Sequence, residues 1–431
     1  MLHLILMKEF DPKRAVEILK KLSFPRLAGT EGEEKARELI VKELESYGYK
    51  PILEEFELMT FRIKEAKFEV LEPWKEEIPC TGVGFSGSTP PEGVEGPIKY
   101  VEVGDPLLLP GEEGYLLLMS QRPRFEEYKK LMKRKPAGII VSESNPYKKL
   151  SHLDMIYEWR KYGLAPMVHI SFKDAYKMLE YGARKGRLIL LQDEWKARSY
   201  NIVVEKEGYK YPEEIVIVCA HYDSVYDVPG STDNAGGTAF VLELARIFSN
   251  VKPKRTLRFV LFSGEELGLR GSLAYVKKHE KELEKIKMVI NFDVHGGALG
   301  SNSVIVTGPT QIKPYLEVVG KEVGIRLSIS EDVFSSDSSS FAKVGIPAVS
   351  FYRSSGVSTA MHSQDDDTKF IGPQAYATLG PLAVRFLNTL VNAEEFPFSR
   401  EIPENIAKKV KEYFEKRLGL EEKKEKEKKE G

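Results

Sequence analysis

Residue types that bind metal ions stand at the ends of three successive apolar runs in the second half of the chain. The runs occupy residues 214–220, 257–263 and 287–293. His221 follows the first run, the pair Glu265 and Glu266 follows the second after one glycine, and Asp293 ends the third. One polar residue at a strand end means little, because polar caps are common there. Three in succession indicate a shared site.

Two further candidates lie outside these runs. Asp233 belongs to the segment GSTDNAGG at 230–237, which opens a predicted helix, and His362 stands between Met361 and Ser363. Two imidazoles and three carboxylates suit two borderline cations such as zinc. If the two metals share one carboxylate, each also has one histidine and one carboxylate of its own. This composition is typical of two-metal hydrolytic sites, where cations about 3.5–4 Å apart polarise a carbonyl and generate hydroxide.

The adjacent carboxylates Glu265 and Glu266 can have different chemical roles in such a site. One can bind a metal while its neighbour, which points elsewhere from the loop, takes the proton of the metal-bridging water. The residue types alone do not assign the two roles.

The chain resembles the co-catalytic zinc aminopeptidase and glutamate carboxypeptidase family in five ordered motifs, HYDSV, GSTDNAGGTA, FSGEELGLRGS, NFD and MHS. The resemblance implies a ligand set of His221 and Asp293 on one zinc, Glu266 and His362 on the other, and Asp233 bridging. It implies that Glu265 is the general base and that Asp223 fixes the tautomer of the nearby ligand imidazole. It also implies a cis peptide bond after the bridging aspartate.

The chain departs from the family pattern at two positions. Some members place a tyrosine before the last histidine to stabilise the oxyanion, and this chain has Met361 there. We expect the metals or another donor to take that role, with Tyr352 as a candidate. Where the family has Ser-Asp-His, this chain has Ser336-Asp337-Ser338, so a substrate contact there lacks its imidazole.

The elements that must position these residues alternate between strand and helix after residue 201. Predicted helices at 235–248 and 272–285 separate the three apolar runs, and a helix at 312–323, a strand at 347–352 and a helix at 374–391 follow. The alternation predicts an α/β fold with a mostly parallel central sheet covered by helices on both faces. Ligands bind such sheets beyond the carboxyl ends of the strands, where the candidate residues stand.

The region from 61 to 191 differs from the strand–helix alternation after residue 201. Its pattern of short strands, turns and small helices predicts an inserted β-rich module. The resemblance implies that this module is a protease-associated domain. We therefore predict a catalytic domain at 1–60 and 192–398, an inserted domain at 61–191, and a C-terminal helix with a charged tail at 399–431. The catalytic domain includes a predicted helix at 30–48, in which Thr30 and Glu33 form a capping box.

Other polar residues near the predicted site have simpler interpretations. We expect His295 to pack against or cap a loop, and the run Asp365–Asp367 to cap the segment that follows it. The serine-rich stretch at 335–340 lacks the base order of a serine hydrolase and predicts a flexible substrate loop.

Composition limits the partners and the location. Lys and Arg total 64 against 65 Asp and Glu, so neither nucleic acid nor an anionic membrane is an expected partner. Cys80 and Cys219 lie far apart, which excludes a disulfide framework and a cysteine-based zinc site. No stretch approaches 18 uncharged apolar residues, and the first ten residues lack a basic leader and a small-residue cleavage site. We therefore expect a soluble, cytoplasmic protein.

The sequence thus predicts a zinc-dependent exopeptidase with two Zn²⁺ per chain and peptide substrates, in particular an aminopeptidase. The alternatives are a carboxypeptidase that acts on acidic dipeptides and a non-catalytic binding protein with the same fold. A homo-oligomer is compatible with this sequence. The residue pattern does not determine the oligomeric state or the side chain that the enzyme prefers at the cleaved end of its substrate.

Overall fold

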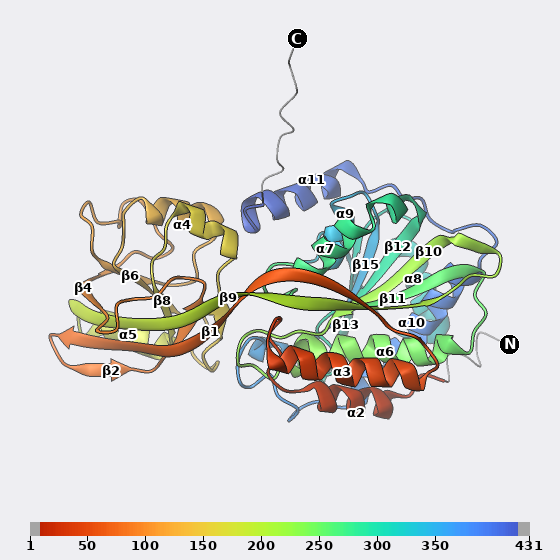
Figure 1. Cartoon of the computed structure of the whole chain (residues 1–431), viewed down its shortest axis with the longest axis horizontal. Coiled ribbons are helices and arrows are strands. Elements are labelled where there is room, and N and C mark those ends of the chain that lie inside the picture. The colour runs from red at the N-terminus through yellow and green to blue at the C-terminus, as the bar shows by residue number, and fades with distance from the viewer. Residues whose placement is uncertain (1–8, 421–431) are drawn as a thin grey trace, which may run out of the picture.

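The computed structural model describes residues 9–420, which form a large α/β body and a smaller β-rich body (Figure 1). The strands of the large body are β9 (Lys185–Lys206), β10 (Tyr211–His221), β11 (Arg255–Phe262), β12 (Ile286–Phe292), β13 (Gly300–Thr307), β14 (Ser328–Glu331) and β15 (Ala348–Ser355). Its helices are α2 (Pro12–Leu22), α3 (Glu31–Ser46), α6 (Gly236–Ser249), α7 (Arg270–Lys278), α8 (Ile312–Val323), α9 (Ser338–Ala342), α10 (Gln374–Asn392) and α11 (Glu404–Glu412).

The central sheet has the strand order β14-β13-β15-β12-β10-β11-β9. β10 pairs in parallel with β11 and β12, and β12 pairs in parallel with β15. The pairs β13–β15 and β11–β9 are antiparallel. Every residue of β11 is buried, as a strand covered on both faces requires. The predicted mostly parallel sheet is confirmed.

Helices cover both faces of this sheet (Figure 1). Apolar side chains of α2, α3, α6, α8 and α10 pack with one face of the strands into a single core cluster. On the other face, Tyr275 of α7 and Phe341 of α9 pack against Phe262 of β11. The sheet is therefore fixed between two helical layers, and its carboxyl edge is the part left free to carry loops.

The smaller body consists of short strands and two helices, close to the predicted inserted module. Its elements are β2 (Glu76–Ile78), β3 (Cys80–Gly84), β4 (Val94–Tyr100), β5 (Leu116–Met119), α4 (Phe125–Met132), β6 (Gly138–Ser142), β7 (Leu153–Asp154), β8 (Met167–Ile170) and α5 (Phe172–Glu180). A separate apolar cluster fills the space between its strands and α5.

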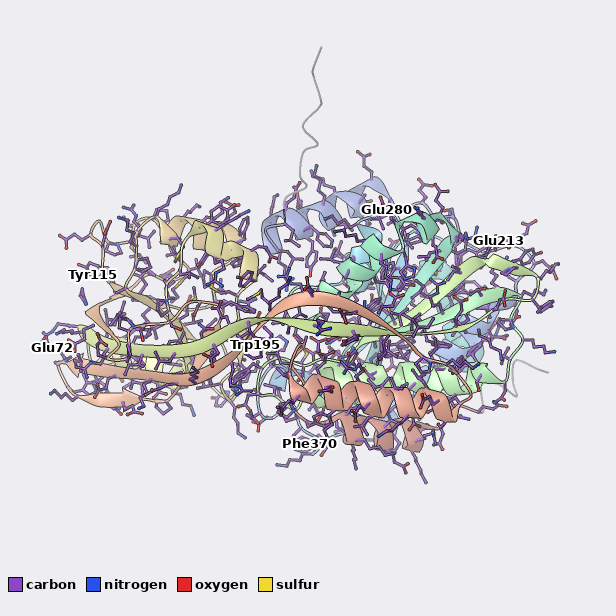
Figure 2. The ribbon with its side chains drawn as sticks, in the orientation of Figure 1. Glu72, Tyr115, Trp195, Glu213, Glu280 and Phe370 are labelled. Carbon is purple, nitrogen blue, oxygen red and sulfur yellow. The ribbon has the colours of Figure 1, made fainter. Side chains whose placement is uncertain are left out.

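A long antiparallel ribbon joins the two bodies. It consists of β1 (Ile52–Glu72) and β9, and Figure 2 shows Trp195 midway along it and Glu72 at its far end. The predicted domain boundaries fall inside this ribbon, because Phe61 pairs with Glu194 and Leu191 pairs with Glu65. The two bodies are thus connected by paired strands instead of loops, and the division into domains stays a prediction.

The helix predicted at 30–48 is present as α3, but the predicted capping box is wrong. α3 begins after Thr30, whose side chain makes no capping hydrogen bond. The buried Glu33 carboxylate accepts hydrogen bonds from the Gly29 N–H (2.8 Å), the Ser199 hydroxyl (3.0 Å) and the Tyr222 hydroxyl (2.6 Å). The contacts from Ser199 and Tyr222 are tertiary, and they tie α3 to β9 and to the residue after β10.

The predicted C-terminal helix is present as α11, which continues into a helical turn at Tyr413–Arg417. Val410 and Phe414 pack against Leu269 and Ala342 of the large body. The charged tail at 421–431 lies outside the described residues. Within residues 9–420, no helix has the length and apolar character needed to cross a membrane.

Candidate metal centre

All five predicted ligands meet at the carboxyl edge of the central sheet. His221 ends β10, Glu266 lies in the loop after β11, Asp293 follows β12, Asp233 lies in the turn before α6, and His362 lies in the loop after β15. Asp233 and Asn234 are joined by a cis peptide bond, as the resemblance implies. Parallel strands bring their ends to one edge, which is why residues far apart in sequence converge here.

Asp233 stands between two histidines and offers a separate carboxylate oxygen to each. His221 Nε2 lies 3.3 Å from Asp233 Oδ1 and 3.3 Å from Asp293 Oδ1. His362 Nε2 lies 3.2 Å from Asp233 Oδ2 and 3.4 Å from Glu266 Oε2. The site therefore consists of two groups of three ligand atoms that share one carboxylate.

Zinc fits both groups. Ligand atoms about 2.1 Å from a tetrahedral zinc ion lie about 3.4 Å from one another, close to the separations found here. Within the described residues, Glu266 Oε1 is buried without a hydrogen-bond partner. Burial raises the pKa of Glu266, and the nearby Asp233 and Glu265 carboxylates raise it further. An enclosed set of carboxylates with two imidazoles has excess negative charge, which divalent cations would neutralise.

Glu265 lies beside these groups in the same cavity. It belongs to neither of the two groups that share Asp233, but it forms a third group with His221 and Glu266. Burial raises its pKa, which makes the ionised carboxylate a stronger base. The assignment of Glu265 as base and Glu266 as ligand stays a prediction.

Asp223 connects the loop after β10 with the Glu265–Glu266 pair. Its two carboxylate oxygens accept the backbone N–H groups of Glu265 and Glu266, each at 3.3 Å. Its Oδ1 lies 3.5 Å from His221 Nδ1, longer than a normal hydrogen bond. The pKa of His221 is raised because its carboxylate neighbours, Asp293 first, outweigh the opposing effect of burial. Asp223 is thus placed to orient both the imidazole and the loop.

Asp366 holds the turn that carries Asp233, which the sequence did not indicate. Its Oδ1 accepts the N–H and the hydroxyl of Thr232, both at 2.8 Å, and its Oδ2 accepts the N–H of Asp233 at 3.1 Å. The predicted capping of the following segment is wrong for Asp366 and correct for Asp367, which accepts the Lys369 N–H. The chain folds back at this point, so the cap serves a turn 133 residues away in sequence.

We expect Asp366→Asn to lower the free energy of unfolding by about 2 kcal/mol, because hydrogen bonds to a buried charged group contribute about 1.5–3 kcal/mol. Denaturant unfolding of metal-free protein measures this. Asp365→Asn is the matched control, since Asp365 is half exposed and its carboxylate forms one ion pair within residues 9–420, with Lys149. Its expected change is below about 0.5 kcal/mol. Equal effects of the two substitutions would contradict the capping role.

Arg26 is a second residue that sequence reasoning missed. It is completely buried, and its guanidinium donates to the carbonyl oxygens of Tyr222 (2.6 Å), Pro229 (2.5 Å) and Gly230 (2.8 Å). Burial lowers its pKa to about 10, so it remains charged at neutral pH. The side chain fixes both ends of the loop between His221 and Asp233. The guanidinium also donates to the nearby carbonyls of Leu22 and Phe24, but its partners in this loop are main-chain atoms about 200 residues away, which leave no local signal.

The smaller body reaches the candidate ligand His362 directly. The His152 N–H donates to the His362 carbonyl at 2.7 Å, and Ser151 forms a β-bridge with Ser363. His362 itself has a left-handed backbone with φ of 63°, and a non-glycine residue holds such a conformation only where its surroundings support it. Residues 151 and 152 are part of that support.

Two other sequence interpretations have clear outcomes. His295 packs between Phe240 and Phe292, which confirms the packing prediction. The predicted flexible loop at 335–340 is wrong, because residues 336–340 are buried and the helix α9 begins within them. Ser335 and the predicted oxyanion candidate Tyr352 line the cavity.

The fold places two groups of possible metal ligands at the carboxyl edge of the sheet, as in metal-dependent hydrolases. Residues 201–387 match the model of Peptidase family M28. This match covers the part of the chain that carries the candidate metal centre, and it confirms the predicted resemblance to a family of peptidases.

Sequence relatives include peptidases, and solved structures share the fold of this chain. The chain is 26% identical to Aminopeptidase YwaD of Bacillus subtilis over 94% of this chain and 90% of the relative. It is 29% identical to Carboxypeptidase Q of Bos taurus over 68% of this chain, and spans just under two thirds (66%) of that relative. A Peptidase M28 precursor from Shewanella amazonensis has a TM-score of 0.80 at 24% identity, covering 93% of this chain and 98% of its own. A zinc aminopeptidase of Bacillus subtilis has a TM-score of 0.76 at 24% identity, covering 92% and 99%.

Proposed function

We propose that this chain is an aminopeptidase that uses two Zn²⁺ ions. The observation that carries the proposal is the Asp233 carboxylate, which directs one oxygen to the group of His221 and the other to the group of His362. Asp293 would complete the first zinc site, and Glu266 the second. When bound, the two ions would polarise the scissile carbonyl and lower the pKa of water.

The protein's own groups supply the proton transfers. Glu265 accepts a proton from the attacking water and returns it to the leaving amine, so the carboxylate is regenerated in each cycle. Asp223 keeps the loop of Glu265 in place through two backbone hydrogen bonds. Arg26 and Asp366 hold the turn around Asp233. Because the fold already holds these groups in position, less entropy is lost when the transition state forms.

Cleavage at the amino end is supported by a relative that is named an aminopeptidase and matches 94% of this chain, against 68% for the bovine carboxypeptidase. We expect leucine amide to be a good substrate and N-acetyl-leucine amide a poor one. Acetylation removes the charged amine, and losing one charge-assisted contact of about 1.5–3 kcal/mol lowers kcat/KM about 10- to 100-fold. Steady-state hydrolysis by the zinc-loaded enzyme measures this.

Two outcomes favour the alternatives. Rapid cleavage of an N-acetyl dipeptide with a free carboxyl end, together with resistance of its C-terminal amide, would identify a carboxypeptidase. Failure to bind zinc would favour a binding protein with this fold. The intact set of ligand residues argues against that alternative.

We also propose that residues 61–191 act as a protease-associated domain that helps to shape the substrate cavity. Its contact with His362 through His152 supports this role. Cytoplasmic location and homo-oligomer formation stay predictions.

A further inference from the structure

The cavity over the candidate metal centre has a volume of about 600 Å³, which suits a ligand the size of a di- or tripeptide. Three parts of the chain enclose it: the carboxyl edge of the sheet, the smaller body, and the C-terminal turn after α11. Trp159 of the smaller body donates its indole N–H to the Leu418 carbonyl at 2.9 Å. This bond joins the two outer walls.

Each outer wall contributes one arginine to this cavity. Arg122 comes from the segment before α4, and Arg417 comes from the turn after α11. Both arginines are exposed residues, and both line the cavity. Asp233, Glu266 and His362 line the same space, so the arginines and the candidate metal centre face one cavity.

Neither guanidinium has a carboxylate partner in the described part of the chain. Arg122 donates one N–H to the main-chain carbonyl of Asp154 at 2.6 Å, which fixes its position and leaves its other donors free. Arg417 lies over the ring of Tyr413, 5.6 Å from its centroid. Asp154 and Arg417 lie near enough to change the pKa of Arg122, which the carboxylate of Asp154 raises and the positive charge of Arg417 lowers. The two positive charges of the arginines exceed the single negative charge of Asp154.

We propose that Arg122 and Arg417 form a carboxylate-binding subsite for the part of the substrate beyond the scissile bond. Guanidinium groups bind carboxylates with paired, charge-assisted hydrogen bonds, and an incoming carboxylate would relieve the repulsion between the two cations. The carboxylate is either the free carboxyl end of a short peptide or an acidic side chain. This inference rests on the proposed aminopeptidase function and narrows its substrates to short or acidic peptides.

The test compares Leu-Ala with Leu-Ala-amide, which differ only in the terminal carboxylate. We expect the wild-type enzyme to have at least about 10-fold higher kcat/KM for the acid, as expected for one charge-assisted contact. Arg122→Gln and Arg417→Gln should each bring this acid-to-amide ratio close to one. Arg124→Gln and Lys416→Gln are matched controls outside the cavity, and they should keep the wild-type ratio.

A second pair, Leu-Glu-amide and Leu-Gln-amide, distinguishes the source of the carboxylate. Selectivity in this pair alone assigns the subsite to an acidic side chain, and selectivity in the first pair alone assigns it to the carboxyl end. Calorimetric titration of metal-free protein with the same four peptides gives a readout that does not depend on hydrolysis. The expected result is tighter binding of the acidic member, and its loss in Arg122→Gln.

The absence of any selectivity in both pairs, while leucine amide is still cleaved, would overturn the subsite and leave the proposed function intact. If leucine amide is not cleaved at all, the aminopeptidase function itself fails. Selectivity that survives both arginine substitutions would also overturn the subsite, because the carboxylate would then be bound elsewhere.

Discussion

Glu265→Gln is expected to lower kcat by about 10²- to 10⁴-fold while the protein keeps its zinc and its fold. Glutamine has the size and hydrogen-bonding groups of glutamate, but it cannot accept the proton of the attacking water. Its neighbour provides the matched comparison, because Glu266 Oε2 faces His362 Nε2 at 3.4 Å and Glu265 belongs to neither group around Asp233. Glu266→Gln should therefore lose zinc affinity and regain part of its activity in excess zinc.

Steady-state kinetics and metal analysis across a zinc titration separate the two variants. The structure also forms a group of His221, Glu265 and Glu266, so the comparison tests a real alternative. If Glu265→Gln loses zinc while Glu266→Gln keeps both ions and is only slower, the two roles are reversed.

Asp233→Ala is expected to remove both zinc ions and essentially all activity, because each ligand group uses one of its carboxylate oxygens. His362→Ala is the matched control, since it disturbs only the group that contains Glu266. Metal analysis after dialysis should give two zinc ions per chain for the wild type, about one for His362→Ala and fewer for Asp233→Ala. A wild-type protein that binds one ion, or an Asp233→Ala protein that binds two, contradicts the shared ligand.

Chelation of the wild-type protein should lower its melting temperature as well as its activity. Metals that bind only the folded chain stabilise it by mass action, about 2.7 kcal/mol for each site when the free metal is 100-fold above its Kd. Differential scanning calorimetry with and without a chelator measures the change. An unchanged melting temperature would show that the ions contribute no stability.

The sequence by itself determined the α/β class and the set of metal-binding residue types. Apolar runs such as 214–220 predict buried strands because a strand covered on both faces must be apolar throughout. The ends of those strands meet at one edge, so His221, Glu266 and Asp293 could be grouped without coordinates. Asp233 and His362 joined them through their motifs, and the structure places all five together.

Only the tertiary structure decided what holds and encloses this site. Asp366 caps the turn of Asp233 from 133 residues away, and Arg26 reaches carbonyls about 200 residues distant. Glu33, which fits a local capping box, instead accepts hydrogen bonds from Ser199 and Tyr222. Local patterns follow from the period of a helix or strand, whereas these contacts depend on how separate elements pack. The same holds for the cavity wall, where Arg122 and Arg417 face one space because the smaller body and the C-terminal turn lie against each other.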